Sequence, residues 1–88
     1  MLLQLLDRLY YAIREATGDL NCRVYIGRFN DNLYEIRIEW HQLGRTRGYR
    51  TVITEQVLKD SDLTFKYTVD DTINKVKYQV GKINYEES

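Results

Sequence analysis

The residues with the greatest capacity for chemistry lie together in one short segment, residues 41–50, which reads HQLGRTRGYR. It holds the only histidine, three arginines and a tyrosine, and it contains no acidic residue although the chain carries 13 acidic and 13 basic side chains. Arginine forms bidentate hydrogen bonds to carboxylates and phosphates. The segment therefore predicts a cationic contact surface, and its candidate partner-binding residues are His41, Arg45, Arg47, Tyr49 and Arg50.

Two other groupings have side chains that could act in catalysis. Cys22 and His41 could form a nucleophile–base pair by spacing alone. However, Cys22 alternates with Val24 and Ile26, which predicts a small buried apolar residue instead. Asp70 and Asp71 are adjacent carboxylates at the expected start of a helix, where capping explains them better than acid–base chemistry.

The sequence also lacks the residues that a cofactor site or a metal site would need. The chain has one cysteine and one histidine, too few for a structural zinc site, and it contains no glycine-rich phosphate-binding motif. We therefore predict a protein that is not an enzyme, with no catalytic residue, no cofactor and no metal ligand.

Length and composition favour a single domain over residues 1–88. The formal net charge is zero, so no global field attracts nucleic acid or an anionic membrane. The single cysteine fits a reducing compartment. The apolar start ends at Asp7, too early for a signal peptide, and no stretch is long enough to span a bilayer. These features predict a cytoplasmic protein without a membrane partner.

Helical periodicity is clear at both ends of the chain. Apolar residues recur at helical spacing over residues 2–17, and Gly18 follows as a C-cap. Near the C-terminus, Val69, Ile73, Val76, Val80 and Ile83 form a second helical stripe. Thr68 with Asp71 resembles a capping box, which predicts that this helix begins at about Thr68.

Between the helices the period changes to two. Residues 22–27 and 33–40 alternate as strands around a turn at 29–32, and a third strand is expected from about Gly48 to Thr54. Segment 41–50 is then mainly the loop that joins the second and third strands. Arg23, Glu35, Arg37 and Glu39 are expected on a solvated outer face, in cross-strand charge pairs.

Residues 55–69 leave two interpretations open. Glu55 to Lys59 fits a short helical turn, whereas Leu63, Phe65, Tyr67 and Val69 alternate as a fourth strand would. The predicted class is α+β: an N-terminal helix, a three-stranded antiparallel meander with or without this fourth strand, and a C-terminal helix.

The order helix, three strands, helix is similar to that of double-stranded-RNA-binding domains. The resemblance implies that Arg45, Arg47 and Arg50 contact phosphates from their loop, beside His41 and Tyr49. The chain departs from that family at two of its contact regions. Residues 68–71 (TVDD) stand where the family has a lysine-rich helix start, and residues 29–32 (FNDN) stand where it has a histidine loop. Nucleic acid is therefore the alternative partner.

In size and layout the chain resembles small phage-encoded accessory and inhibitor proteins, including anti-CRISPR inhibitors. That resemblance implies a viral protein that acts through protein–protein contacts, and it assigns no role to any residue. Arginine and tyrosine are typical of interface hot spots, so a protein partner with an acidic patch is the first hypothesis.

Two further hypotheses stand beside these. A homodimer could form through the exposed side of the last helix, where Tyr78 and Tyr85 lie seven residues apart. Alternatively, segment 41–50 is an ordinary solvated hairpin tip, in which glycines permit the turn and arginines confer solubility.

Overall fold

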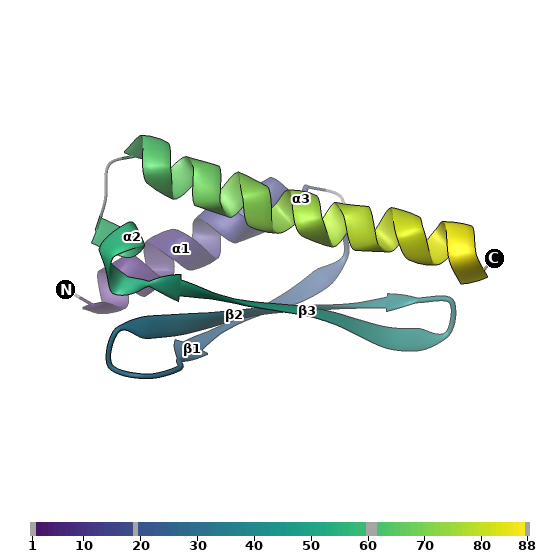
Figure 1. Ribbon diagram of the computed structural model, residues 1–88, viewed down its shortest axis with the longest axis horizontal. Helices are drawn as coiled ribbons and strands as arrows, with labels where there is room; N and C mark the ends of the chain where they lie inside the picture. The colour runs from purple at the N-terminus through teal and green to yellow at the C-terminus, as the bar shows by residue number, and fades with distance from the viewer. Residues whose placement is uncertain (1, 19, 60–61, 88) are drawn as a thin grey trace.

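A computed structural model describes residues 2–18, 20–59 and 62–87. Two layers make up the fold, with the helices on one side of a three-stranded sheet (Figure 1). The α+β class and the order helix, meander, helix are confirmed. The elements are α1 (Leu2–Thr17), β1 (Cys22–Arg28), β2 (Leu33–Gln42), β3 (Arg45–Thr54), α2 (Glu55–Lys59) and α3 (Asp62–Glu87).

The sheet is an antiparallel meander in the order β1-β2-β3, so β2 is central. Ile36 of β2 is opposite Ile26 of β1 and Thr51 of β3, which fixes the register. Because side chains alternate along a strand, one face of the sheet carries the apolar residues of β2 toward the helices. These residues are Tyr34, Ile36, Ile38 and Trp40, and all four are buried.

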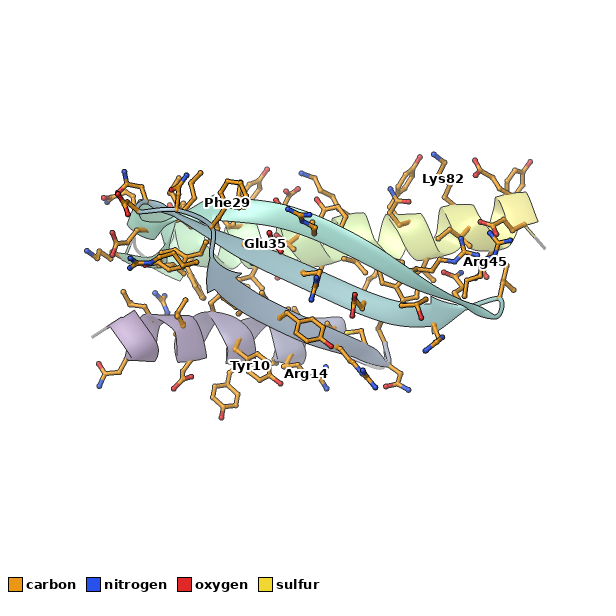
Figure 2. All side chains as sticks on the ribbon, turned by 90° about the horizontal axis from the view of Figure 1, so that it is seen from below. Tyr10, Arg14, Phe29, Glu35, Arg45 and Lys82 are labelled. Carbon is orange, nitrogen blue, oxygen red and sulfur yellow. The ribbon has the colours of Figure 1, made fainter. Side chains whose placement is uncertain are left out.

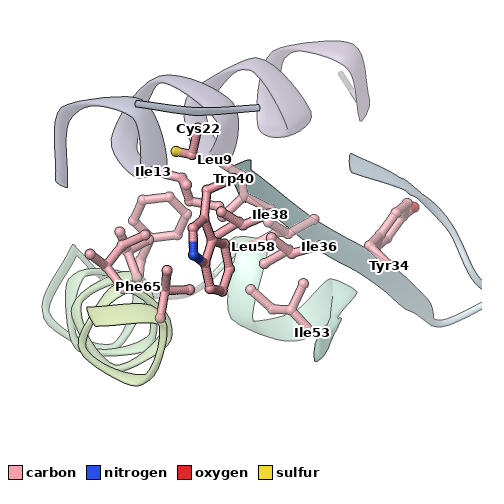
Figure 3. Packing of buried hydrophobic residues seen from close by; sticks show 13 residues of the cluster. Leu9, Ile13, Cys22, Tyr34, Ile36, Ile38, Trp40, Ile53, Leu58 and Phe65 are labelled. Atoms are coloured by element: carbon pink, nitrogen blue, oxygen red, sulfur yellow. The ribbon is translucent and has the colours of Figure 1, made fainter. Parts of the chain in front are cut away.

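The two long helices cover this apolar face together. Seen from below the sheet, α1 lies on the side of β1 and α3 on the side of β3 (Figure 2). Trp40 points into the core between them, and its indole Nε1 donates to Gln42 Oε1 at 2.9 Å (Figure 3). The helices contribute Leu9 and Ile13 from α1 and Phe65, Val69, Ile73 and Val76 from α3.

The second hairpin turns far more tightly than the sequence suggested. β2 continues to Gln42 and β3 begins at Arg45, so Leu43 and Gly44 alone form the turn, with φ of 52° and 76°. Positive φ at both positions is the conformation of a type I′ hairpin turn. The predicted loop over 41–50 is therefore wrong. The ends of β2 and β3 at this turn extend past the apolar core. Polar residues there occupy the positions that carry apolar side chains elsewhere in the strands, so the alternation that predicts a strand is absent.

The predicted short helix at 55–59 is confirmed as α2, and the fourth strand is wrong. Residues 63–69 belong to α3, which buries Phe65 and Val69 one turn apart and leaves Leu63 and Tyr67 exposed. The predicted capping box is also wrong. Thr68 lies inside the helix, where its hydroxyl donates to the Thr64 carbonyl at 3.0 Å.

Gly18 ends a helix and Gly81 lies inside one, and only Gly18 has a backbone conformation that favours glycine. Gly18 ends α1 at φ +57°, as predicted, and its N–H donates to the Glu15 carbonyl. Gly81 lies within α3, and a Cβ added there would meet nothing within 4 Å. Glycine inside a helix costs about 1 kcal/mol relative to alanine. No contact within the described residues explains why Gly81 is present.

Candidate partner-binding face

The structure divides the five predicted contact residues between the two faces of the β2–β3 hairpin. The pairing of His41 with Thr46 and of Gln42 with Arg45 fixes this alternation. His41 and Arg50 lie on the side away from the helices. Arg45, Arg47 and Tyr49 lie on the helix side, so the five do not form one cationic loop.

Arg47 is held by the end of α3. Its guanidinium makes two hydrogen bonds to the Glu87 carboxylate, Nη1–Oε2 at 2.9 Å and Nη2–Oε1 at 2.8 Å. The side chain of Arg47 is only 16% exposed. This bidentate bond holds the pKa of Glu87 below its ordinary value and raises the pKa of Arg47. Arg47 therefore has a structural role.

Neighbouring contacts strengthen the same junction. Gln42 Nε2 donates to the Val80 carbonyl and to Asn84 Oδ1, both at 2.8 Å. Tyr49 is half-buried and packs against the core. Together these contacts fasten the far end of the hairpin to the C-terminal half of α3, and they leave Arg47 and Tyr49 little freedom to meet a partner.

The opposite side of the sheet is open. Within the described residues no helix covers it (Figure 2). We call this side the outer face, and it carries Arg23, Tyr25, Glu35, Arg37, Glu39, His41 and Arg50. The predicted positions of Arg23, Glu35, Arg37 and Glu39 are thus confirmed.

Arginine and tyrosine meet at the centre of the outer face. Arg37 is opposite both Tyr25 and Arg50, and its guanidinium lies 4.8 Å from the centre of the Tyr25 ring. Arg50 Nη2 is 3.0 Å from Glu35 Oε2, and Arg37 Nε is 3.9 Å from Glu39 Oε2. The first ion pair joins two strands, as predicted, whereas the second lies along β2.

Arg23 lies at one end of the outer face, opposite Glu39 of β2. Arg23 forms no ion pair within residues 2–18, 20–59 and 62–87, and on the helix side Arg45 forms none there either. Arg23 and Glu39 also line a shallow pocket of about 300 Å³, together with Asn21, His41 and Thr46. The pocket exists because β1 begins at Cys22, whereas β2 and β3 run past that point.

The structure places Cys22 and His41 on different sides of the sheet. Cys22 is buried on the helix side, as predicted, and Arg14 Nη1 donates to its backbone carbonyl at 2.6 Å. His41 is exposed on the outer face. Within the described residues, no cluster of three or more histidine, cysteine or carboxylate side chains could hold a metal ion. None of the helices in this part of the chain is long and apolar enough to cross a membrane.

No protein family, no curated protein and no solved structure matches this chain. No residue role is therefore transferred from another protein.

Sequence reasoning missed Tyr25 and gave Arg23 and Arg37 no role in binding. The alternation of β1 and β2 had placed these arginines on the outer face, but their neighbours Glu35 and Glu39 favoured a merely solvated surface. The combination of an arginine and a tyrosine in register on adjacent strands is the signal that could have found them.

Proposed function

We propose that this chain is a non-enzymatic binding protein whose outer face contacts an acidic patch on a protein partner. One observation carries the proposal: the sheet face that no described helix covers gathers Arg23, Arg37, Arg50 and Tyr25, with the Arg37 guanidinium 4.8 Å from the centre of the Tyr25 ring. By this proposal the protein acts by occupying a surface of its partner, as an inhibitor or accessory factor of the phage type would.

The chemistry of the face supports this kind of contact. Arginines on a strand are held by the sheet, so less conformational entropy is lost on binding than from a mobile loop. Tyr25 adds an apolar centre that already stacks with a guanidinium. Arg23 offers an unpaired charge to a partner carboxylate, and bidentate pairing of that kind gives directional specificity.

The face also favours a protein over a nucleic acid. Glu35 and Glu39 stand among the arginines. A phosphate backbone is uniformly negative and would be repelled by both carboxylates, whereas an acidic patch of a protein is local and can leave room for them.

A pull-down from host-cell lysate with quantitative mass spectrometry tests the proposal. The outer-face variant is Arg23→Ala/Arg37→Ala/Arg50→Ala. The matched control is Lys59→Ala/Lys66→Ala/Lys82→Ala, which removes the same charge from exposed helix positions. We expect one stoichiometric partner that the control retains and the outer-face variant loses. Retention by both variants, or equal loss by both, would overturn the proposal.

A titration separates the two classes of partner. The probes are fluorescein-labelled poly-glutamate, single-stranded DNA and RNA, and duplexes of each, at low and high salt. We expect poly-glutamate to bind weakly and to release from the outer-face variant. Tighter binding of a nucleic acid that the same variant abolishes, and that falls steeply with salt, would replace the protein partner with nucleic acid.

A further inference from the structure

Large side chains stand exposed in a row along the outward side of α3. Leu63, Tyr67, Tyr78 and Tyr85 are 81%, 71%, 69% and 90% exposed. A helix turns about 100° per residue, so these four lie within a sector of roughly 60° and span about 33 Å. Figure 1 shows that α3 lies on the helix side of the sheet. The core residues of α3 occupy the opposite side of the helix from the row, so the row faces away from the core. We call these four residues the α3 row.

Gly81 belongs to the same side of the helix. It lies four residues before Tyr85 and three after Tyr78, and it leaves the backbone bare between their two rings. Because a side chain at this position would meet nothing in the described residues, nothing there demands a glycine. A bare stretch of helix in a row of aromatic side chains is the shape into which a large side chain of another molecule fits.

Charges flank the row in an ordered way. Asp70 and Asp71 precede Asn74, and Lys75 and Lys77 follow it. Lys75 Nζ is 2.9 Å from Asp71 Oδ2, and this bond raises the pKa of Lys75. The middle of α3 therefore changes from acidic to basic about Asn74.

We infer that the α3 row binds a second copy of this chain, with the two α3 helices antiparallel about Asn74. In such a pair, residues whose numbers add up to about 148 face each other. Tyr67 then fills the gap at Gly81 of the second copy, and Leu63 covers Tyr85 of the second copy. Asn74 lies on the two-fold axis and faces its own equivalent.

The flanking charges fit the antiparallel arrangement, and the gap at Gly81 selects it. Asp70 then lies beside Lys77 of the second copy, and Asp71 lies beside Lys75 of the second copy. Each contact occurs twice because of the two-fold symmetry. In a parallel pair the central residues of the interface would face their own equivalents, with Gly81 against Gly81 and Tyr67 against Tyr67, so no large side chain would fill the gap at Gly81.

The size of the row fits a dimer of moderate affinity. Aromatic side chains bury about 150–250 Å² each when fully enclosed, so three largely exposed tyrosines and a leucine from each copy give roughly 1,000 Å² in total. That area is near the lower limit of about 1,000 Å² for a specific interface. The outer face lies on the other side of the molecule and stays free in the dimer, so this inference does not depend on the proposed function.

Sedimentation velocity over about 1 to 300 µM protein tests the second copy as occupant. We expect a monomer–dimer equilibrium whose Kd rises at least tenfold in Tyr78→Glu and in Gly81→Gln. Gly81→Gln also improves helix propensity, so its weaker dimer cannot be blamed on unfolding. A lone monomer at the highest concentration would overturn the inference and leave a helix of another protein as the occupant. An unchanged dimer in both variants would overturn the α3 row as the interface.

A charge exchange tests the pairing of Asp70 with Lys77. Asp70→Lys and Lys77→Asp are each expected to weaken the dimer about threefold to tenfold, since each creates like-charge contacts. The double variant restores opposite charges across the interface and is expected to recover most of the affinity. A double variant that is weaker than either single variant would overturn the antiparallel register.

Disulfide trapping tests the two-fold axis directly. Under mild oxidation Asn74→Cys is expected to cross-link two copies rapidly, because the two side chains face each other. In an antiparallel pair, position 67 lies about 21 Å along the axis from its own equivalent, so Tyr67→Cys is expected to stay uncross-linked. Cys22 is buried and serves as the internal control. Equal trapping at both positions, or none at position 74, would overturn the antiparallel pair.

Discussion

The outer face and the α3 row occupy opposite sides of the molecule and are built in opposite ways. On the outer face, Arg37 and Arg50 are each held by a carboxylate, and Tyr25 lies under a guanidinium. In the α3 row, aromatic side chains stand in water with their hydroxyl groups as their only polar atoms. Two of the three arginines on the outer face have an ion pair within the described residues, whereas the apolar surface of the α3 row is exposed to water.

This difference indicates what each surface requires. A mixed-charge face loses little free energy when no partner is present, because water and its own ion pairs satisfy the charges. An exposed aromatic row keeps a large apolar area in contact with water, which is unfavourable in proportion to that area. The outer face is therefore stable without a partner, whereas covering the α3 row removes apolar area from water and is favourable.

The largest predicted effect is a loss of the folding stability on which both surfaces depend. Ile38 is fully buried between the sheet and the helices, and Ile38→Ala is expected to lower the free energy of unfolding by about 2–5 kcal/mol. A chain of this size has only about 4–13 kcal/mol in total. Urea denaturation measures the loss. A loss of less than about 1 kcal/mol would contradict the burial of Ile38 in the core that both surfaces share.

The second predicted effect changes binding at the outer face and leaves dimerisation through the α3 row unchanged. The outer-face variant with Arg23, Arg37 and Arg50 changed to alanine is expected to weaken partner binding about 10- to 100-fold, as loss of interface arginines does. Surface substitutions of this kind change the free energy of unfolding by less than about 1 kcal/mol. Surface plasmon resonance and sedimentation together measure both surfaces. A parallel loss of dimerisation would show that the two surfaces are coupled.

The third effect uses one glycine from each surface. Gly81→Ala is expected to raise the free energy of unfolding of the monomer by about 1 kcal/mol through helix propensity, and to weaken the dimer. Gly48→Ala on β3 brings a Cβ only to 3.9 Å from the Ile38 carbonyl, and is expected to stabilise the strand by about 0.5–1 kcal/mol. Thermal unfolding and sedimentation measure the two effects. A weaker dimer in Gly48→Ala would contradict the assignment of the surfaces.

The smallest predicted effect concerns the bond between Arg47 of β3 and Glu87 of α3. The pKa of Glu87 is lowered from its ordinary 4.5 by Arg47, so the stability that this bond supplies is present above that value. It is lost as the pH falls through the lowered pKa of the folded state. Carbon-detected NMR titration of the Glu87 carboxyl measures the pKa, and Glu87→Gln is expected to remove this part of the pH dependence. Titration at or above the ordinary value would contradict the bidentate contact.

Much of the fold could be predicted because periodicity follows burial. Leu9 and Ile13 mark the buried stripe of α1, and Ile36 and Ile38 mark the buried face of β2. The prediction of a strand over residues 63–69 was wrong because Phe65 and Val69 fit two patterns. They belong to an alternating series, and they are also four residues apart, as on one side of a helix. Leu63 and Tyr67 appeared to be core residues of a strand, whereas they are exposed on α3.

The candidate site was less predictable, because contacts between residues far apart in the sequence decide which side chains remain available to a partner. The bond from Arg47 to Glu87 joins positions 40 residues apart and has no local signal. It withdraws Arg47 from the contact surface, whereas the strand register leaves His41 and Arg50 on the outer face. Composition had identified a cationic segment correctly, but only the register shows on which face each charge lies.

The order of the sheet and α3 along the chain has a consequence in time. Phe65, Val69, Ile73 and Val76 complete the core, and they belong to a 26-residue helix that a ribosome would add after the sheet. At about 5–20 residues per second, its synthesis takes roughly 1 to 5 s, whereas a β-hairpin forms in about 1–10 µs. During those seconds the part of the apolar sheet face that α3 covers is exposed to water. The nascent chain is therefore open to aggregation and proteolysis while α3 is being made.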